Sequence, residues 1–353
     1  MLPTCGRHTV VVSPRRRFEG VRALLADVGA TNARFAVLDR NGTVQRVRVF
    51  ACEDYGSIQA AIAAYLRDAL PSTPSKRLHA AALAVAGPVT NDQVALTNHP
   101  WSFSVRELRR HLAIEQLVVV NDFAAVAVAI PHLKSNERYQ VGEGHALAEA
   151  PIGVLGPGSG LGVAGIVPKG GDWLPISGEG GHVTMAPANV REAAVLDRMR
   201  IRFDHVSAER VLSGPGLINL YNTLAEIDGI PASFYTAAQI TECGIGGQES
   251  HCREAVEMFS AMLGTVAGNL ALTLGARGGI YIAGGIVPKF GAAFAGSSFR
   301  SRFEDKGRLR PYLARIPTYV ITQPIPAFIG LAALLRDRPR RPAKGRRTKA
   351  KRN

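Results

Sequence analysis

The chain has little cysteine. Only four occur in 353 residues, Cys5, Cys52, Cys243 and Cys252. They do not stand at the paired spacing of a zinc site, and they are too sparse for the disulfide framework of a small secreted protein. We therefore expect reduced thiols in a cytoplasmic protein, with no structural metal site formed by the chain alone.

The chain also lacks the apolar runs of targeting and membrane segments. The first twenty residues contain arginines but no apolar stretch of the roughly 7–15 residues found in a signal peptide. No apolar run approaches the ~18–20 residues that span a membrane. Hydrophobic residues nonetheless make up 46% of the sequence, and its length suffices for about two domains. We expect a cytoplasmic protein with no membrane partner.

The net charge of +14 is concentrated at the two ends. Residues 336–353 carry +9 and residues 1–20 carry +3, so residues 21–335 carry only +2. A strongly basic protein suggests a nucleic-acid partner, but the nearly neutral body argues against a specific one. The tail at residues 337–353 has almost nothing apolar, and we expect both this tail and the extension at residues 1–20 to be disordered.

Strands and helices are predicted to alternate. Residues 21–38 have the pattern of an apolar strand, a glycine turn and a second apolar strand, and the pattern returns at residues 152–167. A helix is predicted at 57–70, with strands at 81–86 and 117–120. Two strand-turn-strand units, one near the start of each half, predict paired α/β domains that face each other across a cleft.

Helix boundaries in both halves carry recognisable signals. Ser104 and Glu107 have the spacing of a capping box and predict a helix through His111. Residues 252–274 carry apolar side chains near helical spacing, and Gly275 is the expected stop. A strand, a glycine pair and a turn are predicted to follow.

Both strand-turn-strand units contain a turn suited to phosphate. These turns are Asp27–Asn32 and Gly156–Gly162. Glycines let backbone N–H groups turn inward to form a nest for anions, and Ser159 adds a hydroxyl donor. A tight hairpin would explain either turn alone, but two such turns in register favour phosphate binding. Neither matches the Walker pattern, and the first leads into a strand, unlike a Rossmann fingerprint.

An acidic residue follows a buried strand. Asp122 comes directly after Asn121 at the end of the strand predicted at 117–120, which would hold its carboxylate on a rigid element at the cleft. There it could act as a general base. The alternative is that Asp122 caps the helix predicted at residues 123–130.

A third glycine-rich turn carries an acid and an imidazole three residues apart. In Gly178–His182 the sequence is too open to be core, and we expect it to hold a polar ligand. Glu179, His182 and Glu209 could hydrogen-bond sugar hydroxyls. A structural histidine and a metal ligand are alternatives for His182, but no second histidine or cysteine stands at a convincing ligand spacing.

Seven motifs, in order between about Val21 and Leu335, closely resemble those of bacterial glucokinases in the hexokinase and actin superfamily. They are Ala26–Arg34, Thr97–Trp101, Asn121–Phe123, Gly156–Gly162, Gly178–His182, His205–Gly214 and Ile282–Pro288. The resemblance covers nearly the whole chain. It implies a two-domain actin-like (ribonuclease H-like) α/β fold that closes over glucose, with ATP and Mg²⁺ as the phosphoryl donor, in a homodimer.

The resemblance also implies roles for individual residues. Asp122 would be the catalytic base on the 6-hydroxyl of glucose. The residues that would bind glucose beside it are Asn121, Glu179, His182 and Glu209. Those that would contact the nucleotide are Asp27, Gly29, Ala30, Thr31, Asn32, Gly156, Gly158, Ser159, Gly160, Gly284 and Gly285. Asp27 would reach the metal through water.

The chain departs from the family pattern at two positions. The family commonly has a second glycine where Ala30 stands and a threonine where Ser159 stands. Serine keeps the hydroxyl group, whereas alanine is less suited than glycine to a positive φ angle.

The expected small domain comprises residues 21–132 and 323–336, and the expected large domain comprises residues 133–322.

Two alternatives remain open at this point. One is a kinase for another hexose or an amino sugar, because epimers differ by a single hydroxyl. The other is a sugar-sensing transcriptional regulator, which would need a DNA-reading module. About twenty residues precede the first expected strand, too few for a helix-turn-helix domain.

Overall fold

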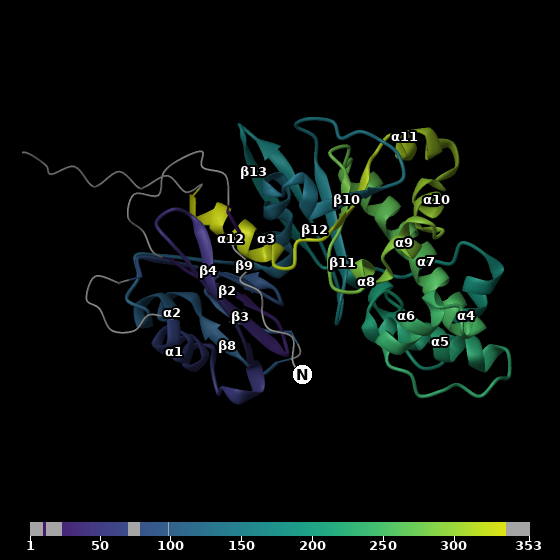
Figure 1. The fold of residues 1–353 in the computed structure, drawn as a ribbon, viewed down its shortest axis with the longest axis horizontal. Helices are drawn as coiled ribbons and strands as arrows, with labels where there is room; N and C mark the ends of the chain where they lie inside the picture. Colours follow the sequence, from purple (N-terminus) through teal and green to yellow (C-terminus); the bar gives the residue numbers. More distant parts are fainter. Residues whose placement is uncertain (1–9, 12–22, 70–77, 98, 337–353) are drawn as a thin grey trace, which may run out of the picture.

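The computed structural model describes residues 10–11, 23–69, 78–97 and 99–336. The expected disordered tail, most of the expected N-terminal extension, Asn98 and Cys5 lie outside these residues. Within the extension, Val10–Val11 form strand β1 and pair with β4, so the expectation of disorder is wrong for these two residues. Two α/β halves lie side by side, the first purple and blue and the second teal and green (Figure 1).

The first half is built on a six-stranded sheet. Its order is β1-β4-β3-β2-β5-β9, antiparallel through β4, β3 and β2 and parallel through β2, β5 and β9. Its further strands are β2 (Ala23–Val28), β3 (Asn32–Leu38), β4 (Thr43–Ala51), β5 (Ala80–Val85) and β9 (Gln116–Asn121). The predicted strands and hairpin are confirmed. A three-stranded sheet of β6 (Val89–Thr90), β7 (Gln93–Ala95) and β8 (Ser102–Ser104) extends this half.

The second half repeats five strands of this topology, and its sixth strand, β10, joins the other end of the sheet. Its sheet has the order β10-β15-β14-β11-β12-β13, antiparallel through β11, β12 and β13 and parallel through β11, β14 and β15. The strands are β10 (Arg138–Val141), β11 (Ile152–Pro157), β12 (Leu161–Lys169), β13 (Asp172–Gly178), β14 (Ile280–Ile282) and β15 (Thr318–Ile321). The predicted duplication of the strand-turn-strand unit is therefore confirmed.

The predicted helices are confirmed, whereas most helices of the second half were not predicted. In α1 (Ile58–Ala69) one apolar face is buried, and α2 (Val105–His111) begins after Ser104, whose side chain accepts from Glu107 N. The second half contains α4 (Val190–Arg200), α5 (Gly214–Ile227), α6 (Ala237–Ile245), α7 (Ser250–Leu274), α8 (Val287–Phe290), α9 (Ala292–Ala295), α10 (Phe299–Glu304) and α11 (Arg310–Ala314). The 3₁₀ turns are η1 (Cys52–Asp54), η2 (Ile130–His132), η3 (Ser135–Glu137), η4 (Gly180–His182), η5 (Ala208–Arg210) and η6 (Gly307–Leu309).

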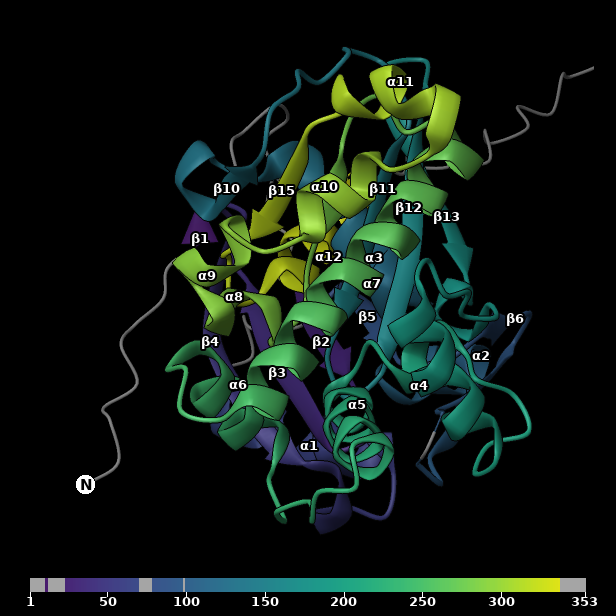
Figure 2. The ribbon, with the colours of Figure 1, turned by 90° about the vertical axis from the view of Figure 1, so that its right-hand side faces the viewer.

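Helix α7 is the central helix of the second half. It crosses the second sheet and packs against α10 along its middle, where Gly264 and Gly268 meet the α10 backbone (Figure 2). Gly275 ends it in the left-handed conformation at φ 59°, as expected from the sequence. Its length and composition would allow it to cross a membrane, but 72% of its most apolar window is buried. This burial is that of a core helix.

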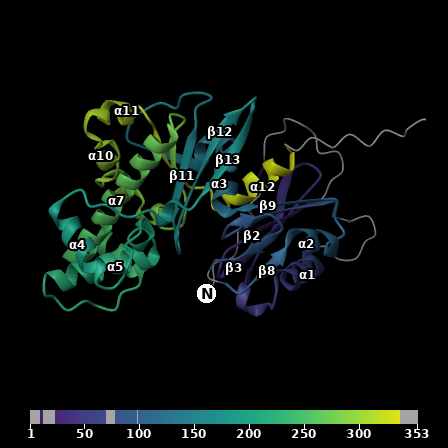
Figure 3. The same cartoon turned by 180° about the vertical axis from the view of Figure 1, so that it is seen from behind.

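Two helices far apart in sequence pack together between the sheets. Helix α3 (Asp122–Ala129) contacts β5 and β9 of the first sheet and β11, β12 and β13 of the second. Helix α12 (Pro326–Arg336) returns to pack on α3 and on β2 and β5 (Figure 3). The C-terminal helix thus lies with the first half. The exact domain boundaries stay a prediction.

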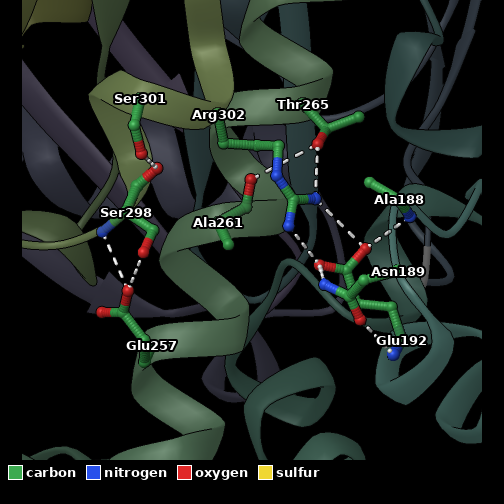
Figure 4. Close-up of polar contacts among 9 residues, drawn as sticks. All are labelled: Ala188, Asn189, Glu192, Glu257, Ala261, Thr265, Ser298, Ser301 and Arg302. Carbon is green, nitrogen blue, oxygen red and sulfur yellow. Dashed lines mark hydrogen bonds and ion pairs between the residues drawn. The ribbon is translucent and has the colours of Figure 1, made fainter. Parts of the chain in front are cut away.

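A buried ion pair joins three helices of the second half. Arg302 of α10 donates from Nη2 to Glu192 Oε1 at 2.7 Å and from Nη1 to Oε2 at 3.2 Å. Glu192, in α4, is 1% exposed and also accepts from Ala188 N and Asn189 Nδ2 (Figure 4). Arg302 reaches Thr265 of α7 as well. Both charges are therefore hydrogen-bonded as well as paired, which a buried ion pair requires.

Three cysteines fall within the described residues. Cys52, Cys243 and Cys252 are all free thiols. This agrees with the expectation of reduced cysteines.

Candidate active site

Asp122 lies where β9 passes into α3. The residue before it, Asn121, is the N-cap, and its Oδ1 accepts from Phe123 N at 3.0 Å and from Ala124 N at 3.2 Å. Asp122 Oδ1 accepts from Phe123 N at 2.9 Å as well. Because Asn121 caps the helix, capping alone does not account for an acidic side chain at position 122.

The Asp122 carboxyl has a raised pKa. Burial is the main cause and raises the pKa to about 6, and the negative charges of Asp27 and Glu179 add to it. The hydrogen bond from Phe123 N acts in the opposite direction. Three carboxylates from separate segments therefore share one electrostatic environment. A carboxylate with a pKa near neutrality is suited to accept a proton.

Asp27 lies at the end of β2, just before the first turn. Its Oδ2 accepts from Arg34 Nη1 at 3.1 Å, and the two residues are directly opposite in the β2–β3 ladder. Burial raises the Asp27 pKa more than the Arg34 guanidinium lowers it. Sequence reasoning missed Arg34, although its position across the hairpin from Asp27 was a usable signal.

The first turn is shorter than expected. Asp27 and Asn32 lie in strands, so only Gly29, Ala30 and Thr31 connect them. Gly29 N donates to Asn32 O at 3.0 Å, and neither Gly29 nor Ala30 has a positive φ angle. Alanine therefore fits position 30 without strain.

The second turn consists of Gly158, Ser159 and Gly160, because Gly156 belongs to β11 and pairs with Gly162 of β12. Gly158 N donates to Gly160 O at 2.8 Å. Among these described residues, the Ser159 and Gly160 N–H groups have no acceptor in the structure, and Ser159 is exposed. The anion-binding nest suggested by the sequence is thus reduced to these two donors and the Ser159 hydroxyl.

Glu209 is held against this second turn. Its Oε2 accepts from Leu161 N at 2.8 Å, and a Cβ atom at Gly160 would overlap the Glu209 carboxylate. Glu209 lies in η5, which contacts η4, the segment that contains His182. Ala208 N also donates to Val183 O at 2.8 Å. The structure therefore brings the two predicted sugar-binding segments together beside the second turn.

A small cavity lies between the two halves beside Asp122. Its volume is about 390 Å³, within the range of ligand pockets. It is lined by Pro88, Val89, Val119, Val120, Asn121, Ala124, Pro175, Ser177, Gly178 and Glu179. Two predicted sugar-binding residues, Asn121 and Glu179, are in its wall, whereas Asp122, His182 and Glu209 are not. His182 and Glu179 are both exposed.

The glycine pair after β14 also lies next to the second turn. Ala283 N donates to Leu155 O at 2.8 Å, and Gly284 has a φ angle of 84°. A Cβ atom at Gly284 would overlap Pro157 O, so glycine is required there by close approach as well as by φ. Nothing lies within 4 Å of the Cβ position at Gly285. Gly285 therefore leaves space beside the turn.

No protein-only metal centre is found in the described part of the chain. There, no group of three or more His, Cys, Asp or Glu side chains could hold a metal ion.

Comparison with known proteins identifies the family. A family model described as Glucokinase matches residues 24–338. A glucokinase from Paramagnetospirillum magneticum is 52% identical over 315 residues, which cover 89% of this chain and 97% of that protein. A glucokinase from Aromatoleum aromaticum is 48% identical over 313 residues, covering 88% and 94%.

A solved structure agrees with the sequence matches. A glucokinase from an Antarctic psychrotroph has a TM-score of 0.80 and 38% identity, covering 90% of this chain and 99% of that one. The predicted two-domain actin-like fold is therefore confirmed. By sequence and by fold, the chain belongs to the glucokinase family.

Proposed function

We propose that this chain transfers the γ-phosphoryl group of ATP to the 6-hydroxyl of glucose, with Asp122 as the general base. The observation that carries the proposal is the Asp122 carboxyl, placed at the end of β9 and with a pKa of about 6. Family membership supports glucose as the substrate. Phosphoryl transfer depends mainly on positioning and on neutralising charge, so a fixed carboxylate and two phosphate turns suit it.

Each predicted site residue has a defined part in this scheme. Asp122 accepts the proton of the 6-hydroxyl as that oxygen bonds to phosphorus. Glu179 and Asn121 lie in the wall of the cavity. The Glu179 carboxylate accepts hydrogen bonds from sugar hydroxyls, and the Asn121 amide can accept or donate them. His182 and Glu209 complete the sugar site once the halves close, and closure excludes water that would compete with the sugar.

The two turns would hold the nucleotide. Ser159 and Gly160 offer backbone N–H donors, and Ser159 offers its hydroxyl to the phosphates. The first turn, Gly29–Thr31 with Asn32, would face the phosphates from the other half, and Gly284–Gly285 would lie beside the adenosine. Asp27 fits Mg²⁺, because a carboxylate is a hard oxygen donor and only its Oδ2 is paired with Arg34. When bound with ATP, Mg²⁺ neutralises phosphate charge.

The test is a coupled assay that detects each sugar phosphate as it forms. Purified protein is given ATP and a panel of glucose, mannose, fructose, galactose and N-acetylated amino sugars. We expect glucose to have the highest kcat/KM and chelation of Mg²⁺ to abolish turnover. A higher kcat/KM for another hexose or an amino sugar would reassign the substrate, and no phosphorylation of any sugar would refute the proposal.

The pH dependence of glucose phosphorylation should follow Asp122. Its pKa is raised to about 6, so the carboxylate that accepts the proton is lost as the pH falls through that value. We expect kcat/KM to fall about tenfold per pH unit below this pKa. Glu179→Gln removes one negative charge that raises the pKa, so it should move the acidic limb to lower pH. A profile that stays flat well below pH 6 would contradict this role.

Glu209→Gln should distinguish two roles of Glu209, binding of the sugar and support of the second turn. The glutamine amide oxygen can still accept from Leu161 N, so the second turn should keep its shape. If the charged carboxylate accepts from a glucose hydroxyl, its loss should cost about 1–3 kcal/mol and raise KM for glucose more than KM for ATP. Steady-state kinetics with each substrate varied in turn give both constants. Equal increases would show that Glu209 acts only through the turn.

We also propose that the enzyme is a cytoplasmic homodimer, as the family resemblance implies. Two domains, residues 21–132 with 323–336 and residues 133–322, are expected to move as units around the bound sugar. No specific nucleic-acid partner is expected. Light scattering of the purified protein measures the oligomeric state, and a monomeric mass at working concentration would refute the dimer.

A further inference from the structure

The ring of Phe123, the residue after the proposed base, packs directly against two glycines of the second half. Its ring lies over Gly162 of β12, where a Cβ atom would overlap ring carbon Cδ2. At Gly156 of β11 a Cβ atom would lie 2.7 Å from Phe123 Cζ, well inside the ~3.5–4 Å of an ordinary carbon–carbon contact. Gly156 and Gly162 are directly opposite in the β11–β12 ladder. The two glycines, which lack side chains, together form the surface on which the Phe123 ring packs, and we call this surface the glycine seat.

This seat lies at the base of the second phosphate turn. Gly156 and Gly162 are followed in the hairpin by one further strand pair, Pro157 with Leu161, and then by Gly158–Gly160. The turn is also tied to Glu209 through Leu161 N and to Gly214, whose N–H donates to Gly158 O at 2.8 Å. The two glycines and the turn therefore belong to one hairpin that is held by hydrogen bonds on both sides.

The opposite side of α3 is packed just as closely. A Cβ atom at Gly330 of α12 would overlap the carbonyl oxygen of Ala125, so the two helices meet at backbone distance. At its N-terminus, α3 is capped by Asn121, and Phe123 N donates to both Asn121 Oδ1 and Asp122 Oδ1. A displacement of the Phe123 ring would therefore be passed to the backbone of the residue that carries the base.

From this geometry we propose that Phe123 is a positioning residue: its ring, seated on Gly156 and Gly162, sets the separation between the Asp122 carboxylate and the phosphate-binding turn. This inference rests on the proposed function. It also assigns a steric role to Gly156 and Gly162, which the sequence pattern had placed in a phosphate loop.

Core packing alone is the competing explanation, and it predicts different kinetics. If the ring only fills space, Gly162→Ala should lower stability, while the folded fraction keeps its kcat. If the ring positions Asp122, the same change should lower kcat, because a displacement of about 1 Å can cost about 10²-fold in rate. KM for glucose should change less than kcat, since neither Gly162 nor Phe123 lines the cavity.

The experiment is a double-mutant cycle on the full-length protein. Gly162→Ala, Phe123→Ala and the double variant are compared in kcat, in KM for glucose and in midpoint of urea unfolding. We expect Gly162→Ala to lower kcat by about 10²-fold, because its methyl group displaces the ring, and Phe123→Ala to lower kcat by about tenfold, because Asp122 loses its positioning contact without a steric overlap. The double variant should have the kcat of Phe123→Ala, which recovers about tenfold of the Gly162→Ala loss, because removing the ring makes room for the methyl group.

Gly165→Ala is the matched control. Gly165 lies on the same strand, and its Cβ would meet Leu274 Cδ1 at 2.7 Å, a milder overlap than that with Phe123 Cδ2 at Gly162 and one made with α7 instead of Phe123. We expect a lower urea midpoint with kcat within about twofold of wild type. A Gly162→Ala variant that keeps wild-type kcat, or a double variant as slow as Gly162→Ala, would overturn the positioning role alone. A wild-type protein inactive on every sugar would overturn the proposed function and, with it, this role.

Discussion

Asp122→Asn is expected to lower kcat for glucose phosphorylation by ~10²–10⁴-fold, the usual contribution of a general base. The amide is nearly isosteric with the carboxylate, but it cannot accept the proton of the 6-hydroxyl. Its side-chain oxygen can still accept from Phe123 N, as Asp122 Oδ1 does at 2.9 Å. The helix start should therefore be kept, because Asn121 remains the N-cap. Single-turnover and steady-state rates at saturating glucose and ATP measure the effect.

Stability provides the control for this substitution. A carboxyl whose pKa is raised by burial is ionised less readily in the folded than in the unfolded protein, so it destabilises the fold as the pH rises through that pKa. The asparagine amide carries no charge, so its burial does not require the desolvation of a carboxylate. The variant should therefore be at least as stable as wild type at neutral pH. Asp172→Asn, at the exposed start of β13, should change neither rate nor stability. Near-normal turnover of Asp122→Asn would remove Asp122 from the mechanism.

Glu192→Ala is expected to destabilise the second half by about 3–5 kcal/mol, because it leaves the Arg302 guanidinium buried without its counter-charge. The Arg302 side chain is only 15% exposed, and both of its terminal nitrogens donate to Glu192. The substitution also removes the acceptors of Ala188 N and Asn189 Nδ2. Urea unfolding, analysed for the free energy of unfolding, measures the loss.

A surface ion pair serves as the comparison. Arg48 and Asp68 are 3.4 Å apart with side chains 56% and 62% exposed, and Asp68→Ala should cost no more than about 1 kcal/mol. The double variant Glu192→Leu/Arg302→Met removes both buried charges together and should recover much of the loss seen with Glu192→Ala. A loss for Glu192→Ala no larger than that for Asp68→Ala would show that the buried pair does not hold these helices together.

Local patterns along the chain predicted part of the secondary structure. The hairpin β2–β3, the capped start of α2 and the end of α7 at Gly275 all follow from residues adjacent in sequence. Periodicity, capping and glycine conformation act over a few residues, so their signal is present in the sequence itself. The duplicated strand-turn-strand unit was visible for the same reason.

The edges of the site were predicted less well. The expected phosphate loops were too long by several residues, because Asp27 is held in its strand by Arg34 across the ladder, and Gly156 is held in its strand opposite Gly162. A glycine-rich sequence does not show why a given glycine is needed. It can allow a backbone conformation that other residues rarely adopt, or it can allow a neighbouring residue to approach closely. The tertiary neighbours show that Gly156 and Gly162 make room: Phe123 lies over both, and the Ala283 backbone also lies close to Gly156.

The sequence by itself predicted the fold class, the repeated strand-turn-strand unit and a set of candidate residues for phosphoryl-transfer chemistry. Only the tertiary structure decided which residues and helices come into contact. Glu209 reaches Leu161 from 48 residues away, Arg302 reaches Glu192 from 110, and α12 returns from the end of the chain to α3. The raised pKa of Asp122 likewise depends on burial and on charges from other segments. Such contacts depend on how both halves pack, and no local pattern along the chain encodes them.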